Sequence, residues 1–353
     1  MGIFAAEHFG RGSMSKIRRV AYVGNFGHTF TTETHIAATL QGLGVEVVEL
    51  QENAVTINEI EKRANECDLL LYTRTWGMKN ERGEVDHAAA CAMLKQLNVP
   101  SASWHLDLYL GLPRSSGVTE GDPFWRTSFV FTPDGDPDSQ AIFEARGIAH
   151  HYLRPAVFKP ECYMAKPSRD LAAEVVFVGS GTPSGGYHPE WPYRGELITF
   201  LRDTYGKRFT KHGSAVLNGG VECLRGHALN VAYASAHVVV GDTLCLGRGD
   251  ARAPRFTHRG YWSDRVYETI GRGGFLIHPW IEGLDDRLKD GEHLRFYSYG
   301  DFDELKRLID FYLDPTNAHE RARIARAGHE RVKAFETYEN RAREVLAKVE
   351  AST

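Results

Sequence analysis

A short segment near the end of the chain, "SDRVYETIGRGGFLIHPW" (residues 263–280), combines residue types that can bind an anion. Ser263 precedes a predicted helix as its N-cap, and backbone N–H groups beyond it are available to phosphate oxygens. Arg265 adds a planar, permanently charged donor in the first turn, and Glu268 follows on the same helix face. The pattern indicates an anion-binding site, and its alternative is a surface Arg265–Glu268 ion pair. We expect the glycine pair that follows to end the helix.

Further candidates for the same ligand follow other predicted strands. Parallel strands end at one edge of a sheet, where open α/β sheets bind ligands. For each arginine among these candidates, the alternative is an exposed, solubilising role. The candidates are Gly179, Ser180, Gly181, Lys211, His212, Arg248, Arg252, Arg255 and Arg259.

An Asp-x-Asp pattern offers a competing site. Asp134 and Asp136 follow a predicted strand in "FTPDGDPDS", and two such carboxylates could hold Mg²⁺ or Mn²⁺ against a diphosphate. We favour a turn instead, with Asp138 as the cap of the helix that follows.

The periodicity of apolar residues predicts the strands and helices that carry these candidate residues. In the first half we predict strands at 20–23, 45–50, 68–74, 99–107 and 128–134, and helices at 32–43, 57–67 and 85–97. After a proline-rich linker we predict strands at 175–181, 208–214, 238–243 and 274–279 and helices at 193–206, 223–237 and from 263, with the rest helical to the end. Alternation of this kind favours two doubly wound parallel sheets, each covered by helices on both faces.

The chain should therefore divide into two similar α/β halves that face each other across a cleft, because 353 residues exceed one hydrophobic core. The C-terminal helix is expected to pack back on the N-terminal domain. The expected division is 1–15 flexible extension, 16–155 N-terminal domain, 156–172 linker, 173–335 C-terminal domain and 336–353 C-terminal helix.

Composition narrows the partners and the compartment. With 42 basic and 46 acidic residues the net charge is −4, which gives no global reason to bind nucleic acid or an anionic membrane. The five cysteines are scattered and form no Cys-x-x-Cys pair, which is typical of reduced thiols in the cytoplasm. The sequence has no apolar run of about 20 residues that would span a bilayer and no signal-peptide core. We expect a cytoplasmic protein.

The order of these motifs resembles the C-terminal domain of group-1-type glycosyltransferases, in particular the branch similar to the spore-maturation protein CgeB. The likeness covers residues 174–345. It rests on "VVFVGSG", "YRGELITFL", "ALNVAYASAHVVVG", the segment 263–280 and "ERARIARAGHERV". The resemblance implies the GT-B fold, which has two Rossmann-like domains. It also implies that the nucleotide sugar binds mostly to the C-terminal domain and the acceptor mostly to the N-terminal one.

The resemblance also implies an activity and residue roles. The activity is transfer of a hexose or pentose from a nucleotide diphosphate sugar, most simply a UDP-sugar, without a metal or another cofactor. Glu268 is the counterpart of the glutamate that holds the donor ribose, whereas Gly260 stands where many relatives have a second glutamate near the transferred sugar.

The first N-terminal loop, "GNFGHTFTTETH", faces the cleft in such a fold. Gly27 joins the donor-binding candidates. His28 is the first candidate for a general base in an inverting reaction, and Asp107, with His105 beside it, is the second. A retaining enzyme would need no protein base, and each of these histidines could instead be exposed or satisfied in the core.

Several alternatives stay open. The acceptor could be a small molecule, a glycan, a protein or a modified base in DNA. A module that binds nucleotide sugars without transfer would show the same sequence features. A Rossmann-type oxidoreductase is disfavoured, because no complete G-x-G-x-x-G fingerprint follows either first strand.

Overall fold

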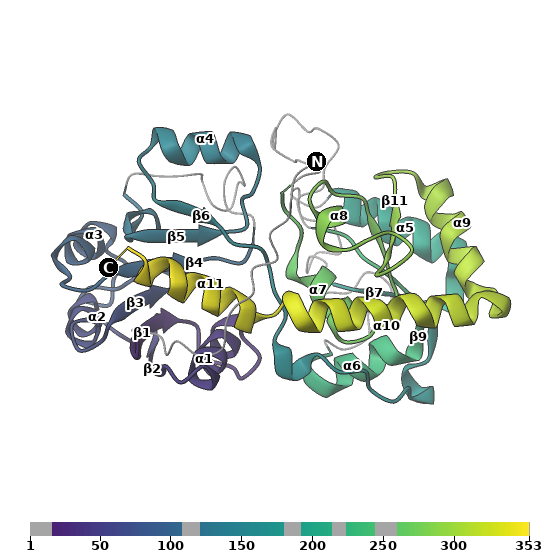
Figure 1. Cartoon of the computed structure of the whole chain (residues 1–353), viewed down its shortest axis with the longest axis horizontal. Coiled ribbons are helices and arrows are strands. Elements are labelled where there is room, and N and C mark those ends of the chain that lie inside the picture. Colours follow the sequence, from purple (N-terminus) through teal and green to yellow (C-terminus); the bar gives the residue numbers. More distant parts are fainter. Residues whose placement is uncertain (1–15, 108–120, 180–191, 214–223, 244–259, 353) are drawn as a thin grey trace.

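The computed structural model describes residues 16–107, 121–179, 192–213, 224–243 and 260–352, and Figure 1 shows two α/β domains side by side. The N-terminal domain holds a six-stranded, wholly parallel sheet in the order β2-β1-β3-β4-β5-β6. Its strands are β1 Arg19–Gly24, β2 Glu46–Gln51, β3 Leu69–Tyr72, β4 Ser101–Trp104, β5 Phe129–Thr132 and β6 His150–Tyr152. Its helices are α1 Thr32–Gly42, α2 Ile57–Ala64, α3 His87–Gln96 and α4 Pro137–Ala145.

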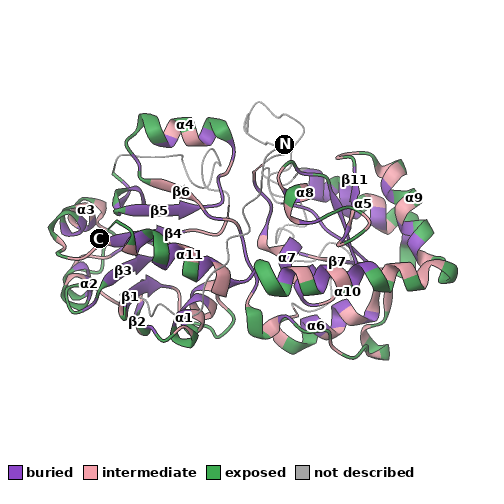
Figure 2. Ribbon diagram, in the orientation of Figure 1, coloured by how far each residue is buried: buried purple, intermediate pink, exposed green. Residues whose placement is uncertain are grey.

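Both faces of this sheet are covered, which explains why its strands read as continuous apolar runs. Successive side chains of β1 point to opposite faces, so Ala21 and Val23 pack in one cluster with α2 and α3. Val20 and Tyr22 pack in another cluster with α1 and the C-terminal helix α11 (Tyr338–Glu350). Figure 2 shows the strands buried and the outer helix faces exposed.

The C-terminal domain repeats the plan with a five-stranded parallel sheet in the order β11-β10-β9-β7-β8. Its strands are β7 Ala173–Val178, β8 Phe209–His212, β9 Ala236–Val240, β10 Leu276–Pro279 and β11 Arg295–Tyr297. Its helices are α5 Pro192–Tyr205, α6 Gly226–Ser235, α7 Asp264–Gly271, α8 Leu284–Arg287, α9 Phe302–Leu313 and α10 Ala318–Phe335. The two sheets confirm the predicted doubly wound architecture.

Two sequence expectations were wrong. The segment after β10 is not helical throughout, since it contains β11, and β6 lies in a stretch for which the sequence predicts no strand. Both are three-residue edge strands made of histidine, arginine and aromatic residues, so apolar periodicity does not reveal them. The expected extension, residues 1–15, lies outside the described residues.

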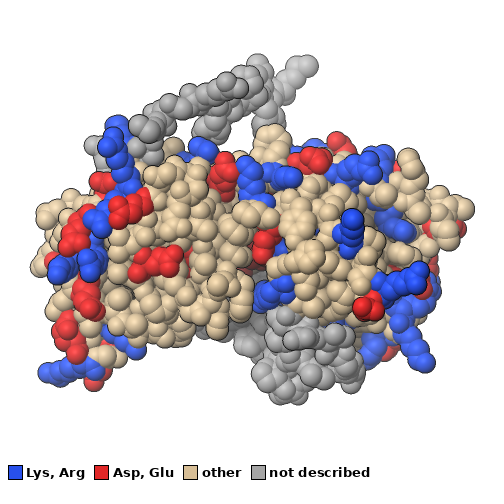
Figure 3. All heavy atoms as spheres, turned by 90° about the horizontal axis from the view of Figure 1, so that it is seen from below, with Lys and Arg blue, Asp and Glu red and all other residues tan. Residues whose placement is uncertain are grey.

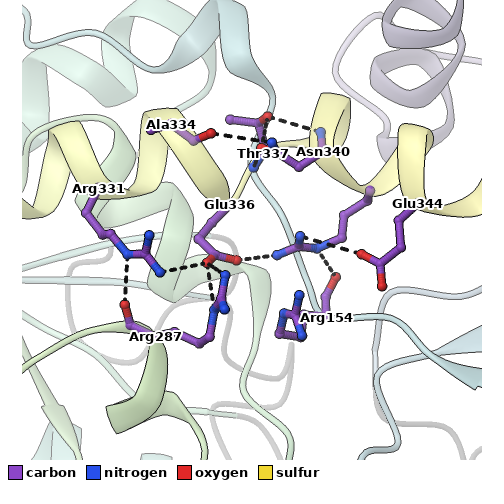
Figure 4. A network of polar contacts seen from close by, with 9 residues as sticks. Arg154, Arg287, Arg331, Ala334, Glu336, Thr337, Asn340 and Glu344 are labelled. Atoms are coloured by element: carbon purple, nitrogen blue, oxygen red, sulfur yellow. Dashed lines mark hydrogen bonds and ion pairs between the residues drawn. The ribbon is translucent and has the colours of Figure 1, made fainter. Parts of the chain in front are cut away.

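The chain passes between the domains twice, and the two crossings are bonded together. Val157 donates its N–H to the Glu336 carbonyl, and Tyr338 donates its N–H to the Val157 carbonyl. Between α10 and α11 the buried Glu336 carboxylate accepts hydrogen bonds from Arg287 at 2.9 and 2.5 Å and from Arg341 (Figure 4). Arg341 also donates to the Arg154 carbonyl at 3.0 Å.

Charge pairing sets the protonation state of Glu336 at this junction. Burial raises the pKa of Glu336, but the cations of Arg341 and Arg287 outweigh burial and hold that pKa below its usual range. Glu336 is therefore ionised at neutral pH and links α8, the start of α11 and the first crossing.

Among the described residues, no helix is both long and apolar enough to cross a bilayer.

Candidate active site

A cavity of about 180 Å³, which we call the interdomain cavity, lies between the two domains. The C-terminal domain contributes the ends of β7 and β8, the start of α6 and the first two turns of α7. The N-terminal domain contributes the loop before α1 and α1 itself, and α11 adds its first residue. The lining residues are Phe30, Thr32, His35, Val178, Gly179, Gly213, Leu224, Arg225, Leu229, Asp264, Arg265, Glu268 and Tyr338.

Helix α7 presents its first turns to this cavity because its other face is apolar. Val266, Tyr267 and Ile270 are buried in the C-terminal core, which leaves Asp264, Arg265 and Glu268 on the cavity side.

Ser263 occupies the N-cap position that the sequence predicts, but its side chain makes no capping bond. Its hydroxyl is buried and has no hydrogen-bond partner among the described residues, and its N–H donates to Thr243 Oγ1 at 3.4 Å. The predicted N-cap position of Ser263 is therefore confirmed.

Arg265 is held only loosely by the protein. Its Nη1 lies 3.8 Å from Asp242 Oδ1 and makes no hydrogen bond to a described residue. Asp242 is instead bonded by the buried Arg194 at 2.6 and 2.9 Å. A Cβ on Gly179 would lie 2.6 Å from Phe177 Cε1 and 2.9 Å from Arg265 Nη1, so a glycine at this position leaves room for both side chains. Arg265 can thus give its hydrogen bonds to a ligand.

Glu268 does not form the surface pair with Arg265 that the alternative required. Its Oε1 instead lies 3.9 Å from Arg272 Nη2, one turn further along α7. Arg272 is itself buried and bonded to Glu161 and to Asn230 Oδ1. Because Arg272 has closer partners, the Glu268 carboxylate remains able to accept hydrogen bonds from hydroxyl groups of a ligand in the cavity.

Three cavity residues were not found from the sequence. Arg225, before α6, has its guanidinium 5.4 Å from the ring centre of Phe30 in the other domain. Asp264 has its pKa raised to about 7, first by burial and then by the charges of Glu268 and Asp107. His35 stacks on Phe158 at 4.2 Å, and burial lowers its pKa, so it is neutral at pH 7. Their importance depends on the apposition of the domains, which no local motif encodes.

Gly27 and His28 lie in a different hollow, the N-terminal pocket, which has a volume of about 670 Å³ at the ends of β1, β2 and β3. The structure places Gly27 in this pocket and not in the interdomain cavity. His28 is exposed and stacks on Phe30 with ring centres 5.0 Å apart. Since Phe30 lines the interdomain cavity, His28 lies where the N-terminal pocket approaches the interdomain cavity.

The remaining predicted residues are spread more widely. Asp107 accepts a hydrogen bond from the Tyr261 hydroxyl at 3.4 Å across the domains, and neither it nor His105 lines either hollow. Lys211 and His212 are buried at the end of β8 and do not line the interdomain cavity. The predicted residues Ser180, Gly181, Arg248, Arg252, Arg255 and Arg259 lie outside the described residues.

The Asp-x-Asp segment forms a turn and a helix start. Asp136, not Asp138, caps α4, and its carboxylate accepts the N–H groups of Asp138 and Ser139. Asp134 is buried and bonded to the Thr132 hydroxyl. The described ranges contain no group of three histidine, cysteine, aspartate or glutamate side chains arranged to hold a metal ion.

Comparison with known proteins gives a family match mainly in the C-terminal domain and structural matches over both domains. Residues 194–347, mostly in the C-terminal domain, match the model of the "Glycosyl transferase-like" family. No curated protein sequence matches the chain.

Solved structures match across both domains. Anabaena Alr3699/HepE in complex with UDP and glucose is 12% identical, with a TM-score of 0.60 over 95% of this chain and 100% of that chain. An alpha-glucosyltransferase in complex with UDP-glucose and DNA containing an abasic site is 10% identical, with a TM-score of 0.67 over 94% and 99%. Sucrose-phosphate synthase of Thermosynechococcus elongatus is 12% identical, with a TM-score of 0.56 over 95% and 100%. The chain has the GT-B fold, and the family match together with this fold supports a glycosyltransferase.

Proposed function

We propose that the chain transfers a sugar from a UDP-sugar and that the interdomain cavity holds the diphosphate and ribose of this donor. The observation that carries the proposal is the convergence on one cavity of the first turns of α7, Arg225 and Arg265. UDP or UDP-glucose is bound by the structural neighbours Alr3699/HepE and alpha-glucosyltransferase. The described cavity is smaller than the ~300–1,000 Å³ of a site for a whole ligand of this size, so we assign it only part of the donor.

In the proposed complex, Arg265 and Arg225 bind the diphosphate, and the helix N-terminus after Ser263 adds positive partial charge. Their role in the reaction is to stabilise the negative charge that develops on the departing diphosphate, without a metal ion. Glu268 accepts the ribose hydroxyl groups. Gly179 supports the site by leaving space for Arg265. Ser180, Arg255 and Lys211 remain proposed donor-side residues from the sequence.

His28 is the proposed general base of an inverting reaction, since its ring lies between the N-terminal pocket and Phe30. It would accept the proton of the attacking acceptor hydroxyl. Asp107 is the second candidate, and its contact with Tyr261 places it where the domains meet.

We further place the chain in the CgeB-like branch, on the order of its C-terminal motifs, and in the cytoplasm, on its scattered cysteines. We propose domains at 16–155 and 173–335, joined by the linker 156–172 and by the helix at 336–353. The packing of α11 in the N-terminal core supports this division.

A donor screen tests the function. The protein is incubated with UDP-, GDP-, ADP- and TDP-sugars, and released nucleotide is measured. We expect release from a UDP-sugar. Binding without release or transfer to any acceptor would indicate a non-catalytic module, whereas a melting temperature raised by NAD(P) and by no nucleotide sugar would contradict the transferase.

A further inference from the structure

The N-terminal pocket has features of a built binding site, beginning with Trp76. This side chain is 43% exposed and lines the pocket, yet the backbone that carries it is tightly fixed. The fully buried Glu52 carboxylate accepts the N–H groups of Thr75, Trp76 and Gly77 at 2.9, 2.7 and 2.8 Å. It also accepts the Tyr72 hydroxyl at 3.0 Å. An exposed indole on such a rigid loop is a preorganised stacking surface.

The polar groups of the pocket are also held in place by the protein. Gln51 accepts the Phe26 N–H at 2.7 Å and donates to Asn53 Oδ1 at 2.9 Å. Asn25 Oδ1 accepts the Gly27 N–H at 3.1 Å. These bonds use the amide oxygens of Asn25 and Asn53 and leave their Nδ2 groups without a hydrogen bond to a described residue. The pocket therefore presents fixed N–H donors to a ligand.

The charge of the pocket restricts that ligand. Glu49 supplies a carboxylate, and the described lining contains no lysine or arginine. At the rim, Lys79 donates its Nζ to the Asn53 carbonyl at 3.1 Å. Phosphate groups of DNA are bound mainly by arginine and lysine, and Glu49 would repel them. Figure 3 shows acidic and basic side chains interspersed over the left part of the face it draws, whereas basic side chains are more frequent than acidic ones over its right part.

From these observations we propose that the N-terminal pocket binds the acceptor and that this acceptor is a neutral carbohydrate. A sugar ring has an apolar face that can lie on Trp76, and its hydroxyl groups both donate and accept hydrogen bonds. They match the carboxylate of Glu49 and the amides of Asn25 and Asn53. His28 lines the same pocket and stacks on Phe30 of the interdomain cavity, so an acceptor hydroxyl beside His28 faces the donor side. This inference rests on the proposed function, because a carbohydrate in this pocket is an acceptor only if the interdomain cavity binds the sugar donor.

The test uses the full chain with maltose, cellobiose, lactose and mannobiose as probes, and duplex DNA containing hydroxymethylcytosine as the competing class. Binding is followed by tryptophan fluorescence, transfer from UDP-[¹⁴C]glucose by labelled product, and donor binding separately by titration with UDP. We expect at least one disaccharide to bind and to accept label. Trp76→Ala should raise the acceptor KM about tenfold, as for a truncated tryptophan anchor, with the UDP dissociation constant within about twofold of wild type.

Trp76→Tyr should restore most of the acceptor affinity, because it keeps an aromatic face. Phe311→Ala is the matched control, since Phe311 is 49% exposed on α9 and lines neither hollow. The proposal is overturned if UDP binds but no disaccharide binds or accepts label, if only the DNA is glucosylated, or if Trp76→Ala leaves the acceptor KM unchanged. Disaccharide binding without UDP binding would instead refute the proposed donor site and leave the carbohydrate pocket standing.

Discussion

Replacing Arg265 by alanine should weaken UDP binding strongly and barely affect folding. The Arg265 guanidinium lies 3.8 Å from Asp242, and Asp242 keeps two closer bonds from Arg194 when Arg265 is removed. The free energy of unfolding should therefore change by less than about 1 kcal/mol, as for a weak ion pair. In the complex, Arg265 would form charge-assisted hydrogen bonds to the diphosphate. Such bonds contribute ~1.5–3 kcal/mol, which corresponds to about a 10- to 150-fold weaker UDP affinity.

Isothermal titration calorimetry measures this change, and urea unfolding checks the fold. Uridine, which lacks the diphosphate, should bind Arg265→Ala and wild type equally. Arg323→Ala is the matched control, because Arg323 is an exposed arginine that bonds to Glu320 and to the Gly291 carbonyl and does not line the interdomain cavity. UDP affinity within twofold of wild type, or an equal loss for uridine, would refute the assignment of Arg265 to the diphosphate.

Three other predictions concern pH, catalysis and stability. Because the pKa of Asp264 is raised to about 7, its carboxylate becomes charged as pH rises from 6 to 8 and repels the diphosphate; UDP-glucose affinity should fall over this range in wild type and not in Asp264→Asn. His28→Gln should lower kcat by about 10²-fold or more and leave the UDP dissociation constant unchanged, as expected for loss of a general base. Glu336→Gln should lower the free energy of unfolding by about 3 kcal/mol in urea titrations, since it removes the nearest carboxylate from the buried Arg341 and leaves Glu344 at 3.9 Å as the other one, whereas Glu320→Gln, in an exposed pair, should leave the free energy of unfolding nearly unchanged.

The lowered pKa of Glu336 makes the free energy of unfolding depend on pH in one direction. Its pKa is lowered in the folded state, so its contribution to stability is present above the unfolded pKa of a glutamate and is lost as pH falls through the lower, folded pKa. The Glu336→Gln difference should therefore shrink on acidification. A difference that is constant between pH 7 and pH 3 would contradict the ion-pair account of the junction.

The sequence predicted the architecture well where burial is symmetrical. Strands such as β1 and β7 are buried on both faces, and continuous apolar runs flanked by amphipathic helices reveal them. β6 and β11 escaped because an edge strand of three residues has neither periodicity nor an apolar run. The capping of α4 was assigned two residues late, because Asp136 and Asp138 are equally good caps by type and only the backbone shows which one precedes the helix.

The candidate site was only half accessible to sequence reasoning. Arg265 and Glu268 were identified because helix spacing and resemblance both mark them. Arg225 and His35 were not, since they reach the interdomain cavity only through the packing of α6 and α1 across the domains. Trp76 also has no motif, and its importance depends on the buried Glu52 that fixes its loop.

We propose that Glu268 holds the donor ribose at the start of α7, and this role can be tested by comparing two nucleotides on two proteins. The dissociation constants of UDP and of 2′,3′-dideoxy-UDP are measured by calorimetry for wild type and Glu268→Ala. We expect wild type to prefer UDP about tenfold or more, as for charge-assisted hydrogen bonds, and Glu268→Ala to bind both nucleotides equally with an unchanged urea midpoint. If wild type does not bind UDP, or if Glu268→Ala keeps the full preference, then Glu268 does not hold the donor ribose.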